Sequence, residues 1–370
     1  MKRTNLKGLS LKDLEEFVIS ISEKRFRGGQ LFDWLYNKEV ETFDEMTTMS
    51  KSLRAKLKET ASIDSINLLT FHRSSDDKTT KFLFELSDGK KIESVLIPPR
   101  TAFENNSAED EDEQKRLTLC VSTQVGCPLD CVFCATGTMG FHRNLTSCEI
   151  IDQYQQVKKI TGKKITNIVF MGMGEPLLNY ENVMNSIDIF STGMSVAARR
   201  ITLSTAGWVD GIIRMADEKK KVKLAVSLHS LNDKVRTELM PLNKKFNLQE
   251  LLEAIQYYYR KTKMRVTFEY ILFSGTNDSA KDIKDIIKLS KSVPCKINII
   301  PFHRIDFANP TEPLLKLTPV SFKDTEKFAQ TLRRNHVSVF IRSSAGEDIA
   351  AACGQLIGYS NLNIADLSIV

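Results

Sequence analysis

Long hydrophobic runs are absent from this sequence of 370 residues. No apolar stretch approaches the roughly 20 residues that a helix needs to cross a bilayer. The opening residues, MKRTNLKGLSLKDLEEF, also lack the apolar region of a secretory signal. We therefore expect a cytoplasmic protein with no membrane partner. Its apolar fraction of 42% is enough for one large or two smaller packed domains.

Cysteine is scarce, and the chain has an odd number of them. The seven cysteines are at positions 120, 127, 131, 134, 148, 295 and 353. In a protein expected in the reducing cytoplasm, this number argues against a framework of permanent disulfides. It favours a metal site or catalytic thiols instead.

The net charge of +6 hides an uneven distribution. Residues 104–116, ENNSAEDEDEQKR, hold six acids and two bases, so the rest of the chain is more basic than the total indicates. A basic body suits a polyanionic partner such as nucleic acid, although mildly basic proteins are common and charge alone does not decide.

The pattern of residues divides the chain into four parts. The first holds short amphipathic helices, one of them opening at Ser10 as its N-cap. The second, around 79–98, alternates like a β-hairpin that turns at SDGK. We place a helical accessory domain at 1–65, a β extension at 66–103, an acidic linker at 104–116 and a core at 117–370. Bases cluster on these helices, where they could bind a nucleic acid or simply form a solvated helix face: Arg25, Arg27, Lys51, Arg54, Lys56 and Lys58.

In the core, short β-branched runs alternate with amphipathic segments. Capping boxes at Thr146 with Glu149, and at Asn247 with Glu250, mark the starts of two helices. Alternation of this kind predicts an α/β fold of parallel βαβ units, forming a full or partial barrel with its chemistry at the C-terminal strand ends. The predicted strands are RLTLCVS (116–122), TNIVFMG (166–172), RITLST (200–205), KLAVSLH (223–229), RVTFEYILF (265–273), KINIIPF (296–302) and VSVFIR (337–342).

Three cysteines follow the first of these strands with C-x3-C-x2-C spacing: Cys127, Cys131 and Cys134. Three thiolates can hold three irons of a [4Fe–4S] cluster and leave the fourth iron open to a cofactor or substrate. The alternative is a structural zinc site, which needs a fourth ligand such as Cys120 or Cys148.

The cysteine motif, with Phe133 before its third cysteine, resembles the signature of radical S-adenosylmethionine (SAM) enzymes. The likeness extends over most of the chain to the RlmN-type RNA adenine methyltransferases, including their N-terminal accessory domain. The segments that carry it occur in the family's order: RFRGGQLFDWLYNKEVETFDEMTTMSKSLRAKL, STQVGCPLDCVFCATGTMGFHRNLT, NIVFMGMGEPLLN, ITLSTAG, LAVSLH, VTFEYILFSGTND and AACGQL.

This resemblance implies a partial (βα)6-type radical SAM barrel with a small N-terminal helical accessory domain and a β-hairpin extension. It implies one [4Fe–4S] cluster, and two SAM molecules consumed per turnover. The implied reaction is methylation of adenosine carbon 2 in 23S rRNA and in tRNA. The implied protein is a monomer served by an electron donor such as flavodoxin.

The resemblance also assigns catalytic roles. Cys353 matches the cysteine that carries the methyl group, and Cys120 matches the thiol that forms a transient disulfide with it. Glu93 matches the proton acceptor, a role that Cys120 could share or take, although the linker at 104–116 separates Glu93 unusually far from Cys120. Read without the family, Cys120 could be a small buried apolar residue and Glu93 a solvated hairpin carboxylate.

Cofactor contacts are implied at several strand ends: Gly174, Glu175, Ser204, Ser227, Leu228, His229 and His303. His303 departs from the family's usual asparagine, and Ala345 departs from its usual second arginine, whereas Arg342 is retained. An imidazole can still donate a hydrogen bond at position 303.

Three other functions compete with this assignment. The first is the related carbon-8 methyltransferase that confers antibiotic resistance, which usually has alanine where this chain has Pro176. The second is a radical enzyme acting on a small molecule, which the basic helices and Cys353 disfavour. The third is a zinc-binding RNA module without catalysis.

Overall fold

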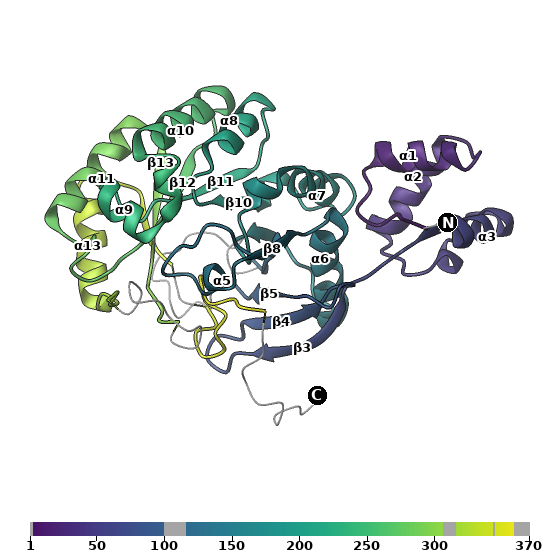
Figure 1. Cartoon of the computed structure of the whole chain (residues 1–370), viewed down its shortest axis with the longest axis horizontal. Helices are drawn as coiled ribbons and strands as arrows, with labels where there is room; N and C mark the ends of the chain where they lie inside the picture. The colour runs from purple at the N-terminus through teal and green to yellow at the C-terminus, as the bar shows by residue number, and fades with distance from the viewer. Residues whose placement is uncertain (1–2, 100–115, 306–315, 343–344, 359–370) are drawn as a thin grey trace.

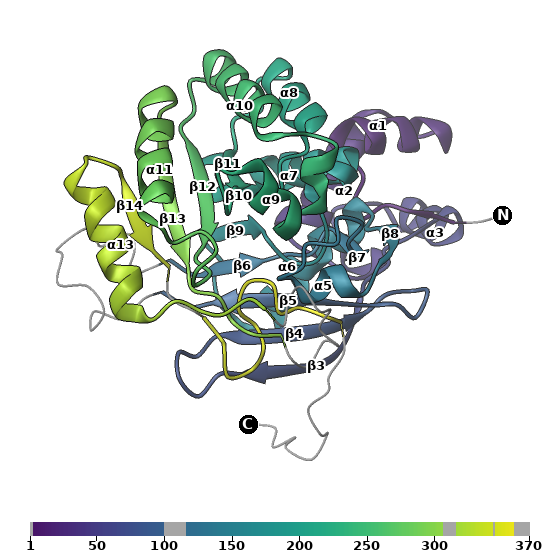
Figure 2. The same cartoon turned by 60° about the vertical axis from the view of Figure 1, so that its left-hand side comes forward.

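A ten-stranded sheet organises the molecule. The computed structural model describes residues 3–99, 116–305, 316–342 and 345–358. The strand order is β14-β13-β12-β11-β10-β9-β6-β5-β4-β3, and the sheet curves around an open side (Figure 2). The predicted linker at 104–116 lies outside the described residues, except for Arg116.

Seven strands on one side of the sheet are parallel, and all seven were predicted from the sequence. Their apolar residues are buried because helices cover the outer face while site residues and the C-terminal loop cover the inner one. They are β6 Thr118–Cys120, β9 Asn167–Phe170, β10 Ile201–Thr205, β11 Lys223–Ser227, β12 Val266–Ile271, β13 Cys295–Ile300 and β14 Val339–Ile341. The sheet does not close, since β14 and β3 are its two edges. The result is the expected partial barrel.

Helices connect the parallel strands along the outside of the barrel (Figure 1). The two predicted capping boxes are present: Thr146 with Glu149 starts α6, and Asn247 with Glu250 starts α10. The outer helices are α6 Ser147–Thr161, α7 Tyr180–Thr192, α8 Val209–Asp217, α10 Leu248–Thr262, α11 Ala280–Ser292 and α13 Phe322–Arg334. Smaller elements complete the core: α5 Ala135–Thr138, α9 Asp233–Leu239, the antiparallel pair β7 Gln124–Gly126 and β8 Phe141–Asn144, and the 3-10 turns η3 Pro176–Asn179, η4 Ala198–Arg200 and η5 Pro241–Lys244.

The other side of the sheet is an antiparallel extension. The predicted hairpin is confirmed as β4 Thr80–Glu85 and β5 Lys91–Ile97, which turn at residues 87–90. A third strand, β3 Asn67–Arg73, was not predicted and forms the edge of the sheet. The extension continues the barrel sheet because β5 pairs with β6, with Val95 opposite Cys120.

The N-terminal helices form a separate projection from the barrel (Figure 1). Ser10 caps the first helix, as predicted. Short parallel strands close the segment at its two ends, β1 Thr4–Asn5 against β2 Ala61–Ser62. The helical elements are α1 Leu11–Ser20, α2 Phe26–Phe32, the π-helix η1 Asp33–Asn37, the 3-10 turn η2 Phe43–Glu45 and α3 Lys51–Thr60.

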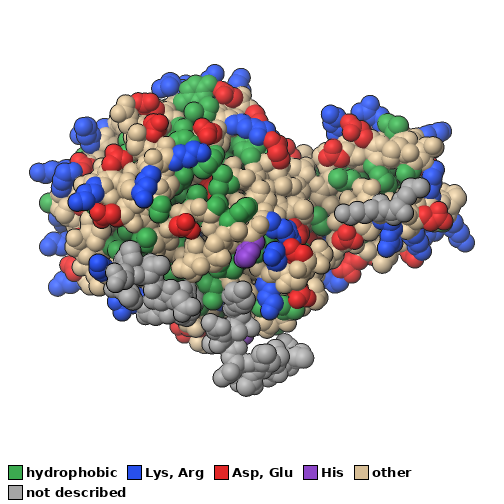
Figure 3. Space-filling view, in the orientation of Figure 1, with side chains coloured by type: hydrophobic (Ala, Val, Ile, Leu, Met, Phe, Trp, Pro, Cys, Tyr) green, Lys and Arg blue, Asp and Glu red, His purple; other side chains and the backbone are tan. Residues whose placement is uncertain are grey.

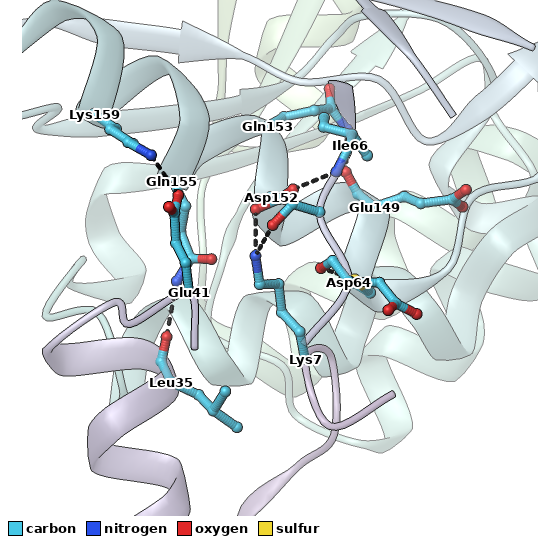
Figure 4. Close-up of polar contacts among 12 residues, drawn as sticks. Lys7, Leu35, Glu41, Asp64, Ile66, Glu149, Asp152, Gln153, Gln155 and Lys159 are labelled. Carbon is cyan, nitrogen blue, oxygen red and sulfur yellow. Dashed lines mark hydrogen bonds and ion pairs between the residues drawn. The ribbon is translucent and has the colours of Figure 1, made fainter. Parts of the chain in front are cut away.

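A buried ion pair joins the N-terminal segment to the barrel. Lys7 Nζ lies 2.7 Å from Asp152 Oδ1 of α6, and the Ile66 amide donates to Asp152 Oδ2 (Figure 4). Farther along α6, Gln155 donates to the Leu35 carbonyl at 2.9 Å. These contacts fix the projection against one barrel helix. Among the described residues, no helix is long and apolar enough to cross a membrane.

Candidate active site

The residues assigned to the site gather at the C-terminal edge of the parallel strands. The cysteine loop follows β6 and β7, Glu175 follows β9, and His229 follows β11. His303 follows β13, and Arg342 directly follows β14. Parallel strands place these ends along one edge, so residues distant in sequence face one space.

The cysteine loop runs from β7 into the single turn of α5. Gly126 begins it with a φ of +73°, where an added Cβ would lie 1.8 Å from the Gly140 carbonyl oxygen, so only glycine fits. Burial raises the pKa of the Cys127, Cys131 and Cys134 thiols. Neighbouring cysteines raise the pKa of Cys127 and Cys131 further, so these thiols lie together. Buried thiols of this kind lose their protons when a metal binds.

The three thiols fit an iron–sulfur cluster better than a single ion. No group of three or more His, Cys, Asp or Glu within the described ranges is arranged to hold one metal ion. In a [4Fe–4S] cluster each cysteine binds a different iron, so the sulfurs stand farther apart than the ligands of one ion. Cys148 Sγ instead accepts a hydrogen bond from Asn5 at 3.2 Å, and Cys120 lies beside Cys353. Neither Cys148 nor Cys120 is thus given a place with the three cysteines of the loop, and no contact within the described residues favours the four-cysteine zinc site.

Glu175 is a buried carboxylate at the end of β9. Its Oε1 accepts from the Leu177 amide at 3.0 Å, and its Oε2 accepts from the Ala206 amide at 2.8 Å. Burial raises the pKa of Glu175 to about 7. The preceding Gly174 has a φ of +97°, and an added Cβ would lie 2.4 Å from Gln124 Cβ. Packing against Gln124 therefore requires glycine at this position, and the cofactor contact of Gly174 stays a prediction.

Four more of the predicted contacts lie at or directly after the next two strands. Ser204 and Ser227 are half-buried at the ends of β10 and β11, and Leu228 is fully buried. His229 is also buried, and its Nδ1 accepts from the Ile271 amide at 3.0 Å. Burial, followed by the positive charge of Arg236, lowers the pKa of His229 to about 3, so the ring is neutral. The structure therefore gives His229 a packing role between β11 and β12.

Arg236 is a site residue that sequence reasoning missed. It lies on α9 and is almost fully buried. Its guanidinium donates to the Ala206 carbonyl at 2.7 Å and to the Ser227 carbonyl at 3.3 Å, so it ties the ends of β10 and β11 together. Burial lowers the pKa of Arg236 to about 10, and the nearby Cys131 acts in the opposite direction. In the sequence, the only signal for Arg236 was that it is an arginine in a helical segment.

His303 contacts the loop that carries Cys353. Its Nδ1 lies 2.9 Å from Glu347 Oε1. The family's asparagine is thus replaced here by a residue that bridges β13 to the C-terminal loop. Ala345, the other departure, lies in the same loop.

Cys120 and Cys353 line one cavity of about 30 Å³, room for about one water molecule. Burial and then the negative charge of a Cys353 thiolate raise the pKa of Cys120 to about 12, whereas Arg342 acts to lower it. Arg342 lines the same cavity, and its Nη1 lies 3.6 Å from Glu269 Oε2. Electrostatic attraction, first from Cys353 and also from Glu269 and Cys120, raises the pKa of Arg342.

Glu93 lies on the same strand face as the two-cysteine cavity. It is two positions from Val95, which lines the cavity and pairs with Cys120, so alternation points both side chains the same way. Glu93 is only 1% exposed and forms an ion pair with Lys81 on β4. The solvated-carboxylate alternative is therefore wrong. Lys81 was not predicted, because its partner lies on another strand.

Comparisons with known proteins agree with this architecture. A family model described as the ribosomal RNA large subunit methyltransferase N-terminal domain matches residues 4–63. A second, the radical SAM superfamily, matches residues 121–289. The two matches correspond to the projecting helices and to the larger part of the barrel.

Curated relatives match nearly the whole chain. A probable dual-specificity RNA methyltransferase RlmN from Thermotoga sp. (strain RQ2) is 45% identical over 95% of this chain and 97% of its own. The protein of the same name from Christiangramia forsetii is 40% identical over 97% of each chain. A crystal structure of a radical SAM methyltransferase from Sphaerobacter thermophilus superposes with a TM-score of 0.84 at 38% identity, covering 96% of this chain and all of that one.

Proposed function

The chain belongs to the RlmN family of radical SAM RNA methyltransferases, and we propose that it methylates carbon 2 of adenosine in 23S rRNA and in tRNA. Enzymes of this superfamily use a [4Fe–4S] cluster and SAM. The observation that carries the proposal is the cavity shared by Cys120 and Cys353 at the edge where the cysteine loop lies. Two thiols that line one cavity are what a methyl carrier and its releasing partner require.

The chemistry explains why a carrier is needed. Carbon 2 of adenine lies between two nitrogens and is too electron-poor to attack a sulfonium. A carbon radical can add to it instead. Bound cluster and SAM supply the 5′-deoxyadenosyl radical that removes a hydrogen atom from the carried methyl group.

Cys353 is the proposed carrier. It is exposed to solvent, so its sulfur is reachable by both SAM and RNA. Its thiolate attacks the SAM methyl group, forming a sulfur–carbon bond as the methyl–sulfonium bond breaks and S-adenosylhomocysteine leaves. After hydrogen abstraction, the methylene carbon bonds to carbon 2 and links the RNA to Cys353. Glu93 accepts the proton that leaves carbon 2.

Cys120 is the proposed releasing thiol. Its thiolate sulfur bonds to the Cys353 sulfur as the carbon–sulfur bond breaks, and the methylene carbon takes up a proton to become the methyl group of the released RNA. The one electron that this step gives back would be taken up by a bound cluster. An external thiol reductant must then restore both cysteines. The attack requires a thiolate, and Arg342 beside the cavity favours that form of the buried Cys120.

Other residues hold the cofactors in this proposal. Cys127, Cys131 and Cys134 would ligate the cluster. Glu175 would accept a hydrogen bond from the SAM ammonium group, with Gly174 beside it. The remaining cofactor contacts that we propose are Ser204, Ser227, Leu228, His229 and His303.

RNA binding is proposed for the basic surface. Lysine and arginine side chains spread over the outer helices and the N-terminal projection, interleaved with acids (Figure 3). The electrostatic contribution of the projection is smaller than its sequence indicates, since three of its six bases pair with local acids: Arg25 with Glu15, Lys56 with Glu23 and Lys58 with Asp44. We retain a flavodoxin-type electron donor, a monomeric state and a cytoplasmic location as predictions.

The carbon-8 methyltransferase is the second candidate. It would use the same cluster and both cysteines. Pro176, which opens η3 directly after Glu175, matches the carbon-2 enzymes. No contact within the described residues favours carbon 8.

Nucleoside mass spectrometry after an anaerobic reaction tests the proposal. The reconstituted protein would be combined with SAM, a reductant and either ribosomal or transfer RNA. We expect 2-methyladenosine from the wild type in both RNAs and none from Cys353→Ala. Formation of 8-methyladenosine would show that the enzyme methylates carbon 8 instead of carbon 2. If neither product forms on protein that holds its cluster and cleaves SAM, the RNA assignment is wrong.

A further inference from the structure

The loop that carries Cys353 has no regular structure of its own. Within residues 345–358 the backbone forms turns rather than a helix or strand, with hydrogen bonds such as Ala351 N–H to the Gly346 carbonyl at 2.8 Å, and the Gly354 carbonyl accepts from the Ala135 amide of α5 at 2.6 Å. A loop of this kind does not fix a side chain by itself. Since Cys353 must meet a sulfonium, a base and a second thiol, contacts from the rest of the protein have to hold it.

Two charged side chains of the antiparallel extension form hydrogen bonds with the backbone of this loop. Lys81 Nζ donates to the Ala350 carbonyl at 3.2 Å and lies 3.2 Å from Glu93 Oε1. The other oxygen, Glu93 Oε2, accepts from the amides of Ile357 at 2.8 Å and Gly358 at 3.2 Å. The pair thus holds the loop before and after Cys353, and we call it the Lys81–Glu93 clasp.

Burial makes the clasp sensitive to charge. Lys81 is 7% exposed and Glu93 is 1% exposed, so water does not replace a lost partner. The two amide donors also require an acceptor, which an ionised carboxylate provides best. Within the described part of the chain, His72 on β3 is a titratable group coupled to both members of the pair. Burial, and then the positive charge of Lys81, lowers the pKa of His72, so it adds no cation near neutral pH.

We propose that Lys81 is a positioning residue that, with ionised Glu93, holds the Cys353 loop in its reactive place, and that protonation of Glu93 releases the loop. The positioning of the loop by Lys81 and Glu93 rests on the contacts alone. The release of the loop rests on the proposed function, in which the proton lost by carbon 2 moves to Glu93. No electron is transferred in that step. Neutral Glu93 keeps one weaker acceptor and loses its attraction to Lys81, so the loop carrying the RNA-linked Cys353 is freed to meet Cys120.

Hydrogen exchange of the full-length, cluster-containing protein without RNA tests the clasp. Lys81→Met removes the charge at similar length, Lys81→Arg retains it, and Glu93→Gln imitates the protonated acid. Lys78→Met is the matched control, because Lys78 is an exposed lysine in the turn before β4. We expect peptides from 345–358 to exchange at least about tenfold faster in Lys81→Met and Glu93→Gln, with α1 and α10 unchanged. Lys81→Arg should restore slow exchange.

Alkylation of Cys353 by iodoacetamide provides the second readout, and it should be faster in the same two variants. Wild-type exchange and alkylation in both Lys81→Met and Glu93→Gln would overturn the clasp. If Lys81→Met does not fold, the result for Glu93→Gln decides whether the clasp holds the loop, since glutamine keeps the shape of the glutamate side chain. A failure of the clasp can be told apart from a failure of the proposed function. The exchange and alkylation measurements use no RNA, whereas the nucleoside assay does not report on the loop.

The releasing step needs its own measurement. In Cys120→Ala protein carrying the RNA adduct, we expect fast exchange at 345–358, close to that of Glu93→Gln without RNA. Slow exchange in an adduct that has lost its carbon-2 proton would reject release and leave the positioning role in place.

Discussion

Lys7 and Asp152 form an ion pair of 2.7 Å with both side chains almost completely shielded from water. Lys7 Nζ also donates to Ser65 Oγ at 2.8 Å. The pair therefore joins both ends of the N-terminal segment to α6. Because β1 and β2 pair beside it, this contact fixes both ends of the projection against the barrel, and the Gln155–Leu35 contact adds a second attachment farther along α6.

Removal of one member of this pair should destabilise the protein strongly. Lys7→Met leaves the Asp152 carboxylate buried without its cation, and we expect the free energy of unfolding to fall by about 3–5 kcal/mol. The combined Lys7→Met and Asp152→Leu change should cost less than the sum of the two single changes. Urea titration of the four proteins measures the coupling. Lys159→Met, which breaks an exposed pair on the same helix, should cost less than about 1 kcal/mol.

Arg342 should control how fast Cys120 reacts. Burial raises the pKa of Cys120 to about 12 and Arg342 opposes this, so Arg342→Met should raise that pKa further. Each unit of increase lowers the thiolate fraction tenfold. We expect disulfide formation between Cys120 and Cys353 in a glutathione buffer at pH 8 to slow roughly tenfold, as followed by mass spectrometry. The rate of disulfide formation should be intermediate in Arg342→Lys and unchanged in Arg333→Met, a control at an exposed arginine on α13. Equal rates in Arg342→Met, Arg342→Lys and Arg333→Met would refute the role of Arg342.

His229 should make the native state sensitive to acid. Burial lowers the pKa of His229 to about 3, compared with about 6.5 in an unfolded chain. Below pH 6.5 the unfolded chain therefore binds a proton that the native chain excludes, and stability is lost as the pH falls. This group alone should cost about 2 kcal/mol between pH 7 and pH 5. Urea titrations of wild type and His229→Asn at both pH values measure this contribution, and the loss of stability between pH 7 and pH 5 should be about 2 kcal/mol smaller in the variant.

Cys120→Ala should stop the reaction at the RNA-linked stage. The carrier Cys353 remains, so methyl transfer and radical addition proceed, but no second thiol cleaves the carbon–sulfur bond. We expect a protein–RNA adduct that survives denaturing gels and disappears after nuclease treatment. Cys295→Ala, a buried cysteine on β13 outside the site, should turn over normally. An adduct that also forms with Cys353→Ala would exclude Cys353 as the carrier.

RNA binding should weaken steeply with salt. Each phosphate neutralised by a lysine or arginine contributes a slope of about −0.7 to −0.9 to the plot of log K against log salt. Filter binding of transfer RNA between low and moderate salt gives this slope. A flat plot would contradict binding through the basic surface.

The parallel strands could be predicted because buried strands appear as short β-branched runs between capped helices. Strand β3, NLLTFHR, was missed because it is an edge strand with alternating exposed residues and resembles a loop. The positions of the cysteines followed from the motif and from the family resemblance. The partners of Glu93 and His303 could not be predicted, since Lys81, Glu347 and Ile357 reach them only through the folded sheet and a loop without periodicity.

The pairing of β5 with β6 has a consequence for how the chain can be rearranged. Ile97 lies opposite Thr118 and Leu96 opposite Leu119, so the sheet itself sets the register between the strands of Glu93 and Cys120. The length of the connection between these neighbours is then free to differ without moving either side chain. New chain ends could be opened there by circular permutation, leaving the barrel and its thiols in place.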